Sequence, residues 1–249
     1  MTDLRPFGID VSRHQGVIDW EVVKAHKPEV EFCGIRAGIS WRYVDPFFGS
    51  NWAEAKKVNI PRAAYHVLYP DQDWKRQMDH FLKLVGDDKP EMGYVIDLEL
   101  VRDIGPYDIR AIVGACQEYL QWMTGMDTII YSRAQWIDDY MTWSATPPVW
   151  YHDVWWWLAH YLPVGMRGEH KGPPDLPRGV NAEDVIIHQT SDKQPNIGGQ
   201  AKTTDTNRWV SYMKINEFME DGMIAEPEPT PEPDDCCEKL DAIKAMLEE

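Results

Sequence analysis

Apolar and polar residues recur with two different periods along the first 225 residues of the chain. Short apolar runs typical of strands cover residues 7–12, 32–38, 62–69, 93–100, 128–132, 155–161 and 184–191. Between them, apolar residues follow helical spacing over residues 19–27, 47–59, 73–86 and 107–125. This alternation predicts an α/β fold with parallel strands joined by crossover helices. No glycine fingerprint follows the first strand, so a β/α barrel is favoured over an open doubly wound sheet.

The pattern changes after residue 225. The segment "EPEPTPEPDD" at 226–235 alternates proline with acids, which predicts an extended, self-repelling linker. In residues 236–249, a short heptad-like stripe predicts an amphipathic helix that docks onto a larger assembly or associates with its own copies. The stripe consists of Cys236, Leu240, Ile243 and Leu247. A solvated tail is an equally good interpretation, because so short a helix is marginal alone.

Composition excludes several classes of function. The net charge of −16 argues against nucleic acid or an anionic membrane as the main partner. No apolar run approaches the roughly 20 residues of a membrane span. The sequence has neither a zinc-like Cys/His spacing nor a glycine-rich phosphate loop, so no metal and no cofactor are expected. Cys33 and Cys116 lie in apolar segments and are expected to be buried free thiols, whereas Cys236 and Cys237 could cross-link chains under oxidising conditions.

Two carboxylates stand out in the apolar stretch "YVIDLEL" at 94–100. Asp97 and Glu99 are two residues apart, and in a strand such side chains share a face. Like charges this close push one pKa upward, which is how proteins keep a general acid protonated near neutral pH. Asp10 and His66 also fall near predicted strand ends, and in a barrel those ends meet at one mouth. A solvated or arginine-bound pair of acids is the alternative for Asp97 and Glu99 taken alone.

Seven segments together resemble a known family. They are "GIDVSRHQGVIDW" (8–20), "GIRAG" (34–38), "NWAEAKKVNIPRAAYHV" (51–67), "VIDLEL" (95–100), "IIYS" (129–132), "WLAHY" (157–161) and "HQTSD…IGG…TDTNRW" (188–209). Their order and separation resemble the family-25 glycoside hydrolases, muramidases of the bacterial cell wall that include many phage endolysins. The resemblance implies an irregular TIM-like β/α barrel over residues 1–225, with an acidic groove at the C-terminal ends of the strands.

The resemblance also implies a set of catalytic acids, namely Asp10, Asp97, Glu99 and Asp205. Glu99 takes the place of the proton donor, and Asp97 that of the nucleophile or of the acid that steers the substrate's acetamido group. The implied function is a peptidoglycan hydrolase that cuts the β-1,4 bond between N-acetylmuramic acid and N-acetylglucosamine. Retention is expected, because an i, i+2 pair can reach the roughly 5–5.5 Å carboxyl separation of retaining enzymes.

Sugar rings stack on aromatic side chains, so aromatic residues near the strand ends are expected to bind substrate. The candidates are Tyr65, Tyr69, Trp74, Tyr131, Trp157 and Tyr161, together with Gln189. The family's "YHF" motif favours Tyr65, while the neighbouring His66 would point to the other face of its strand. Arg36, a charge in an apolar run, is expected to pair with Asp97 or Asp10.

Two positions depart from the family pattern. Residues 188–190 read "HQT" where the family usually has "WQY", and Val67 replaces an aromatic residue. The alternative to an enzyme is therefore a non-catalytic glycan-binding module of the same barrel on a cell wall or virion, or a structural protein. The N-terminal sequence lacks the features of a secretory signal, so synthesis in the host cytoplasm is expected. The protein would then act on the wall after release or as part of a virion.

Overall fold

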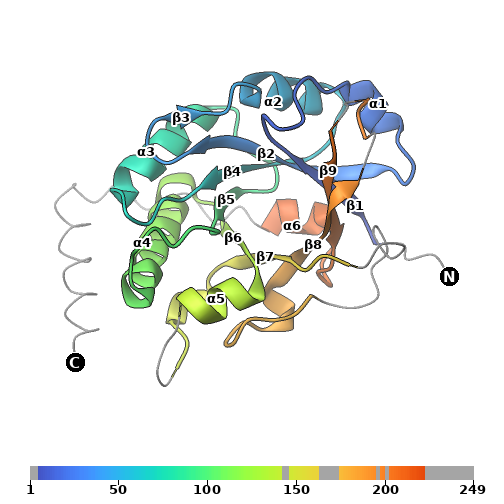
Figure 1. Ribbon diagram of the computed structural model, residues 1–249. Coiled ribbons are helices and arrows are strands. Elements are labelled where there is room, and N and C mark those ends of the chain that lie inside the picture. Colours follow the sequence, from blue (N-terminus) through green and yellow to red (C-terminus); the bar gives the residue numbers. More distant parts are fainter. Residues whose placement is uncertain (1–4, 142–145, 163–173, 195–196, 200–201, 222–249) are drawn as a thin grey trace.

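The computed structural model describes residues 5–141, 146–162, 174–194, 197–199 and 202–221. Within them, eight strands close into a barrel in the order β1-β9-β8-β7-β6-β5-β4-β2, with β1 hydrogen-bonded to β2 and the short β3 added outside β2 (Figure 1). The strands are β1 (Phe7–Val11), β2 (Val30–Ile39), β3 (Tyr43–Val44), β4 (Arg62–Val67), β5 (Tyr94–Asp97), β6 (Thr128–Ser132), β7 (Trp155–Ala159), β8 (Val185–Gln194) and β9 (Thr204–Trp209).

Helices surround the outside of this barrel (Figure 1). They are α1 (Trp20–Ala25), α2 (Phe48–Lys57), α3 (Trp74–Val85), α4 (Pro106–Thr124), α5 (Ala134–Tyr140) and α6 (Ile215–Asp221), with the 3₁₀ turns η1 (Val149–His152) and η2 (Ala182–Asp184). Local sequence sets their ends. Asp73 caps α3 by accepting a bond from the Arg76 amide at 2.9 Å, and α4 begins at Pro106 and stops at Gly125, whose φ is +66°. In the described residues, no helix is long and apolar enough to span a membrane.

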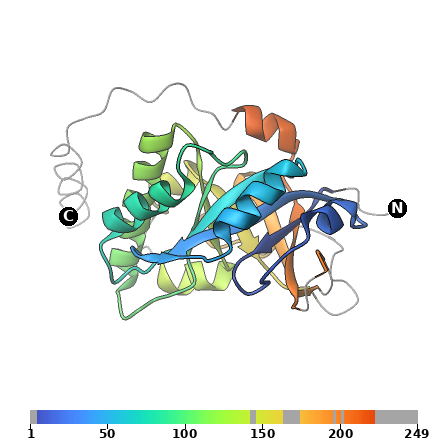
Figure 2. The ribbon, with the colours of Figure 1, turned by 90° about the horizontal axis from the view of Figure 1, so that it is seen from above.

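Two apolar cores follow from the alternation of side chains along each strand. The larger core lies between the barrel wall and the helices. The smaller one fills the barrel lumen with side chains such as Phe32, Val95, Ile129 and Trp157. Helix α6 adds Phe218 to this inner core and lies at one end of the barrel (Figure 2). The lumen is therefore packed rather than open, and any site must lie at a mouth.

A glycine in β2 makes room for the largest side chain in the lumen. A Cβ added to Gly34 would lie 2.6 Å from Cη2 of Trp157 and 3.2 Å from Cβ of Asp10. Real Cβ atoms do not approach so closely, so Trp157 of β7 can reach across the lumen only because position 34 has no side chain. The indole thereby forms the floor beneath Asp10.

The predicted α/β barrel is confirmed, but one strand of it was not predicted. Strands β1, β2 and β4 to β8 are parallel, as expected, whereas β9 runs antiparallel to both of its neighbours, β1 and β8. Strand β9 and helices α5 and α6 were not predicted. Strand β5 ends at Asp97, so Glu99 lies beyond it rather than within it. Cys33 and Cys116 are buried free thiols, as predicted. Residues 226–249, including the predicted linker and helix, lie outside the described residues.

Candidate active site

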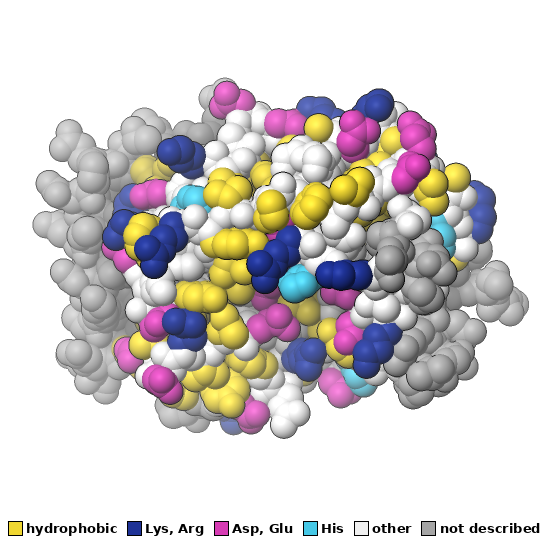
Figure 3. Space-filling view, turned by 45° about the horizontal axis from the view of Figure 1, so that its top comes forward, with side chains coloured by type: hydrophobic (Ala, Val, Ile, Leu, Met, Phe, Trp, Pro, Cys, Tyr) yellow, Lys and Arg dark blue, Asp and Glu magenta, His cyan; other side chains and the backbone are white. Residues whose placement is uncertain are grey.

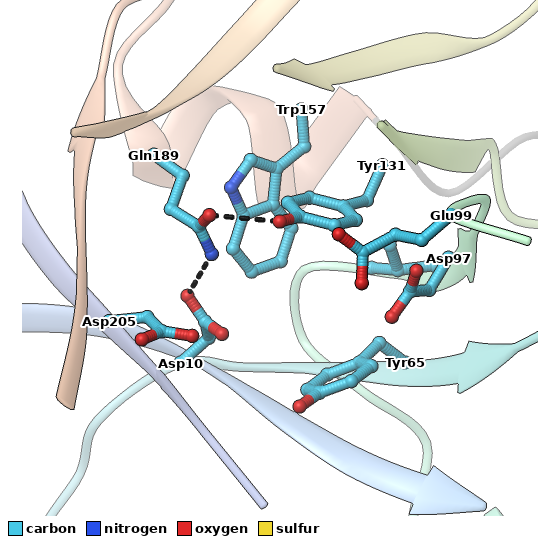
Figure 4. Close-up of a pocket in the computed structure, with 9 residues that line it drawn as sticks. Asp10, Tyr65, Asp97, Glu99, Tyr131, Trp157, Gln189 and Asp205 are labelled. Carbon is cyan, nitrogen blue, oxygen red and sulfur yellow. Dashed lines mark hydrogen bonds between the residues drawn. The ribbon is translucent and has the colours of Figure 1, made fainter. Parts of the chain in front are cut away.

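A pocket opens at the C-terminal ends of the parallel strands, and four acids from three segments line it. Its lining consists of Asp10, Tyr65, Val95, Asp97, Glu99, Tyr131, Trp157, Gln189 and Asp205. Figure 4 shows these side chains converging from opposite sides of the barrel, and in Figure 3 acidic side chains lie in the central hollow. All four acids predicted from the sequence are thus brought together.

Strand register explains how residues far apart in sequence meet here. Asp10 of β1 lies directly opposite Asp205 of antiparallel β9, and Asp97 of β5 is paired with Tyr131 of β6. Side chains alternate along a strand, so Asp10 points into the barrel while its neighbour Ile9 is fully buried in the outer core. The inward-facing residues near the strand ends form one ring around the mouth. This ring is polar, whereas the lumen below it is apolar.

A chain of hydrogen bonds fixes Asp10. Its Oδ2 accepts one bond from Gln189 Nε2 at 2.9 Å and another from Asn207 Nδ2 at 2.8 Å. Gln189 in turn accepts from the Tyr131 hydroxyl at 2.8 Å, and Asn207 accepts from Trp157 Nε1 at 2.8 Å. Because the amides are themselves held, the orientation of the Asp10 carboxyl is set by groups on four other strands.

Asp97 is the most isolated of the acids. It is 6% exposed, and its Oδ1 has no hydrogen-bond partner within the described part of the chain. Burial raises the pKa of Asp97 well above its ordinary value, and the nearby Glu99 and Asp10 raise it further, while Arg36 acts in the opposite direction. A buried carboxyl with an unsatisfied oxygen is costly to stability and is typical of a functional position.

Glu99 is placed differently, because its side chain is exposed at the mouth of the pocket. Surrounding protein atoms nevertheless displace water from its carboxyl, which raises its pKa, and Asp10 adds to the rise. Arg133, which follows β6, lowers the pKa of Glu99. Glu99 thus combines a raised pKa with access to solvent, as a proton donor to a bound ligand requires.

Asp10 and Asp205 form a coupled pair. Burial is the largest cause that raises the pKa of both carboxyls, and the neighbouring Asp10 charge raises that of Asp205 further, to about 9. The hydrogen bond between the two carboxyls lowers the pKa of Asp10 and raises that of Asp205. The proton of the pair therefore resides on Asp205 at neutral pH, and Asp10 is its acceptor.

The expected pairing of Arg36 with Asp97 or Asp10 was wrong. Arg36 Nε donates instead to Oδ2 of Asp45 at 2.8 Å, and both side chains are buried. Asp45 follows β3, and the turn between β2 and β3 carries it back over the inward face of β2. Arg36 acts on Asp97 only through its field.

The predicted sugar-binding residues divide into four groups. Tyr65, Tyr131, Trp157 and Gln189 line the acidic pocket. Tyr161 lies beside it, where its hydroxyl accepts from Arg133 Nη2 at 3.3 Å. Tyr69 lines a second pocket, together with Arg13 and Arg42. Trp74 packs edge-on against Tyr119 in the outer core, and His66 is also buried there against Phe81.

Sequence reasoning missed two residues that shape the site. Asn207 holds Asp10, and Arg133 acts on Glu99. A signal for Asn207 was present, since it stands two residues after Asp205 and shares its face if the segment is a strand. Among the described residues, no group of three or more histidine, cysteine or acidic side chains is arranged to hold a metal ion.

Comparison with known proteins shows the family of the chain. Residues 9–198 match the family described as "Glycosyl hydrolases family 25". The chain belongs to glycosyl hydrolase family 25. The matched range contains Asp10, Asp97 and Glu99 and stops before Asp205, so the fourth acid is placed by the β1–β9 register alone.

Relatives of this family-25 chain include curated proteins and solved structures. It is 31% identical over 157 residues to "Uncharacterized protein YegX" of Escherichia coli K12, and 29% identical over 139 residues to "Lysozyme M1" of Streptomyces globisporus. These alignments cover 62% and 52% of the chain, and 56% and 47% of the relatives, so the chain spans about half the length of the curated relatives it matches.

Solved structures share the fold at lower identity. A bacterial lysozyme from Streptomyces coelicolor aligns with a TM-score of 0.73 at 23% identity, covering 88% of this chain and all of that one. A family-25 glycosyl hydrolase from Bacillus anthracis aligns with a TM-score of 0.70 at 24% identity, covering 90% and 96%. These alignments show that the family-25 barrel extends over most of the chain.

Proposed function

We propose that the protein is a peptidoglycan hydrolase, an N-acetylmuramidase that cleaves the β-1,4 bond between N-acetylmuramic acid and N-acetylglucosamine with retention. The observation that carries the proposal is the meeting of four carboxyls at one barrel mouth, with exposed Glu99 beside buried Asp97. Membership of family 25 and the similarity to a protein named Lysozyme M1 support the reaction class.

In this proposal Glu99 is the general acid. A glycosidic oxygen is a poor leaving group and needs a proton as its bond breaks. The raised pKa of Glu99 keeps that proton available, and its exposure at the mouth lets it reach a bound glycan. A protonated carboxyl among other carboxyls is the usual arrangement for this chemistry.

Asp97 supplies negative charge to the oxocarbenium-like transition state, either as the nucleophile or by steering the acetamido group of the substrate. Asp97 takes this role in its ionised form, with Oδ1 free to accept. A proton held on Glu99 removes the Glu99 charge, which is one of the causes that raise the pKa of Asp97. Retention follows if the Asp97 and Glu99 carboxyls stand about 5–5.5 Å apart rather than about 6.5–9.5 Å. Only Leu98 separates the two residues, and because Glu99 lies just beyond β5, the proposal of the shorter distance rests on this closeness in sequence.

The glycan would lie across the mouth rather than enter the barrel. The acidic cavity measures about 80 Å³, which corresponds to only a few water molecules at roughly 30 Å³ each. Tyr65, Tyr131 and Trp157 offer aromatic surface around it. We propose lysis of the bacterial cell wall as the biological role, with the protein acting after release from the host or on a virion. Residues 236–249 are proposed to mediate docking or self-association.

The test is digestion of purified peptidoglycan followed by mass spectrometry of the soluble products. Muramidase action gives fragments with N-acetylmuramic acid at the reducing end, and retention gives the β-anomer first by NMR. Glu99→Gln is expected to lower the rate at least about 100-fold, the usual contribution of a general acid. Glu118→Gln, the same change at an exposed position of α4, is the matched control.

The outcome also separates the competing function. If the wild-type protein releases no reducing ends from walls of several chemotypes yet sediments with them, a glycan-binding module replaces the enzyme. If products end in N-acetylglucosamine, the family chemistry stands but the proposed bond is wrong.

A further inference from the structure

A second pocket lies at the same barrel mouth and takes no part in the acidic cluster. It measures about 330 Å³, within the size range of small-ligand sites. Its lining comprises Arg13, Ile39, Ser40, Arg42, Tyr43, Tyr69 and Gln72. Arg13 follows β1, Ile39 ends β2 and Tyr69 follows β4, so the pocket sits above three parallel strands. Two of them, β1 and β4, also supply residues to the acidic site.

The charge of this pocket is opposite to that of the protein. The chain carries a net charge of −16, yet the lining has two arginines and no acid. Within the described residues, neither the Arg13 nor the Arg42 guanidinium forms an ion pair; Arg13 lies 5.6 Å from the Tyr43 ring and Arg42 4.7 Å from the Trp41 ring. Asp45, the nearest buried acid, is already occupied by Arg36 and by the backbone amide of Arg13.

Two further arginines, Arg76 and Arg102, lie near this pocket. The Arg76 guanidinium also lies over the Trp41 ring, 4.1 Å from its centroid. Arg102 lies 4.1 Å from the Tyr69 ring and is neutralised by Asp71. Guanidinium groups held on aromatic faces are pre-oriented to bind a planar anion by donating two parallel hydrogen bonds to it.

Hydrogen bonds hold the walls of this pocket in place. Gln77, fully buried in α3, accepts from the Tyr69 amide at 2.9 Å and donates to the Tyr69 and Gln72 carbonyls at 2.9 and 3.2 Å. Ser40 holds a left-handed backbone, with φ of 56°, and its hydroxyl bonds to Gln72. A non-glycine residue in this conformation costs energy, and such strain collects at ligand sites.

We propose that this pocket is a subsite for the carboxylates of the peptide stem on the muramyl residue, an inference that rests on the proposed function. Tyr65 of the acidic site and Tyr69 of this pocket are four residues apart, and since the chain bends after Val67, their Cα atoms are separated by at most about 13 Å. A stem of three or four residues spans about 10–14 Å, so it reaches from a glycan at the acids to the arginines. A single substituent on the sugar ring is too short to reach them.

The test measures binding, by titration calorimetry, of an N-acetylmuramyl tetrapeptide with free carboxyls and of the same compound with its carboxyls amidated. The wild-type protein is expected to bind the acid form at least about tenfold more tightly. Arg13→Gln with Arg42→Gln should remove this advantage, and Arg42→Lys should retain part of it. Lys57→Gln with Lys83→Gln, which removes the same charge from the C-terminal ends of α2 and α3, should leave it intact.

Equal binding of both compounds, or unchanged binding by the double arginine variant, overturns the proposal. Stronger competition by glycerol phosphate than by the muramyl peptide also overturns it, by assigning the pocket to a phosphate-bearing wall polymer. If the double variant unfolds, raising the salt concentration with wild-type protein replaces it, since only the acid form should weaken. The binding measurement requires no cleavage, so the two proposals can fail separately. If the wild-type protein cleaves no peptidoglycan but still binds the acid form more tightly, the hydrolase proposal is wrong and the subsite proposal is supported.

Discussion

Asp10 and Asp205 face each other across the antiparallel β1–β9 pair and share one proton. The two residues are separated by almost the whole barrel in sequence, yet they occupy directly opposed positions. Since Gln189 and Asn207 both donate to Asp10, the proton settles on Asp205, where the Asp10 charge holds it. The pair therefore carries about one negative charge at neutral pH instead of two.

Replacing Asp205 is expected to stabilise the protein at neutral pH. The folded state holds a proton on Asp205 up to about pH 9, whereas the unfolded chain releases it near its ordinary value of 3.8. The contribution of Asp205 to the free energy of unfolding is therefore fully present below about pH 4 and is lost as the pH rises toward 9. Asp205→Asn mimics the protonated form, so its melting temperature at pH 7.5 should rise by about 2–4 °C for each ~1 kcal/mol gained.

Thermal unfolding between pH 5 and 9 measures this directly. The slope of melting temperature against pH should be flatter in Asp205→Asn than in the wild type. Asp139→Asn, an exposed residue of α5, should reproduce the wild-type slope. A lower melting temperature at pH 7.5 with an unchanged slope would show that Asp205 is not protonated in the folded protein.

Removal of Arg133 is expected to move the alkaline limb of the pH–rate profile upward. Arg133 lowers the pKa of Glu99, so Arg133→Gln should let Glu99 keep its proton to higher pH. The measurement is kcat/KM on peptidoglycan between pH 4 and 9. Arg133→Lys keeps the charge and should keep the wild-type limb. An unshifted limb in Arg133→Gln would mean that Glu99 is not the titrating acid.

Gln189 is expected to be needed for both stability and catalysis, because it links Tyr131 to Asp10. Gln189→Leu leaves a buried hydroxyl without its acceptor and removes one donor from Asp10. The expected cost is about 1–3 kcal/mol in denaturant unfolding, with reduced turnover. Gln135→Leu on the exposed face of α5 should stay within about 0.5 kcal/mol of the wild type. Equal effects of the two substitutions would remove the structural role assigned to Gln189.

Gly34→Ala tests the packing beneath the acids. The added methyl would press on Trp157, whose indole holds Asn207 and through it Asp10. Overpacking of this kind costs about 1–3 kcal/mol, and the displaced indole should also lower activity. Gly49→Ala is the matched control: it lies in α2 with open space around it and should stabilise the protein by about 0.5–1 kcal/mol. A neutral Gly34→Ala would show that the lumen can relax around position 34.

The barrel could be predicted from the sequence because most of its strands carry a strong local signal. Strands such as β4 and β6 are short apolar runs between amphipathic helices, and both were predicted within two residues of their observed ends. Strand β9 was missed because its sequence, "TDTNRW", is polar. Its polarity has a physical cause. Asp205 and Asn207 occupy the inward-facing positions of β9, which are usually apolar, and they form hydrogen bonds in the site.

The candidate site was predictable as a set of acids but not as a geometry. Asp10, Asp97 and Glu99 could be found from their places at strand ends, and Asp205 from the family resemblance. The partner of Arg36 could not be found, because Asp45 reaches it through the turn between β2 and β3 rather than through a strand register. Tyr69 follows the same strand as Tyr65, but the chain bends after Val67 and delivers it to the second pocket.

The closure of the barrel by β1 and β9 has a consequence for the cell that makes this protein. Nothing can pair with the free edge of β1 until residues 204–209 have left the ribosome, so an unfinished chain lacks one wall of its acidic centre. Long-range pairing of this kind is also slow. We therefore expect wall-cleaving capacity to appear only after translation has passed β9, with prematurely terminated chains inert toward the wall and dependent on chaperones.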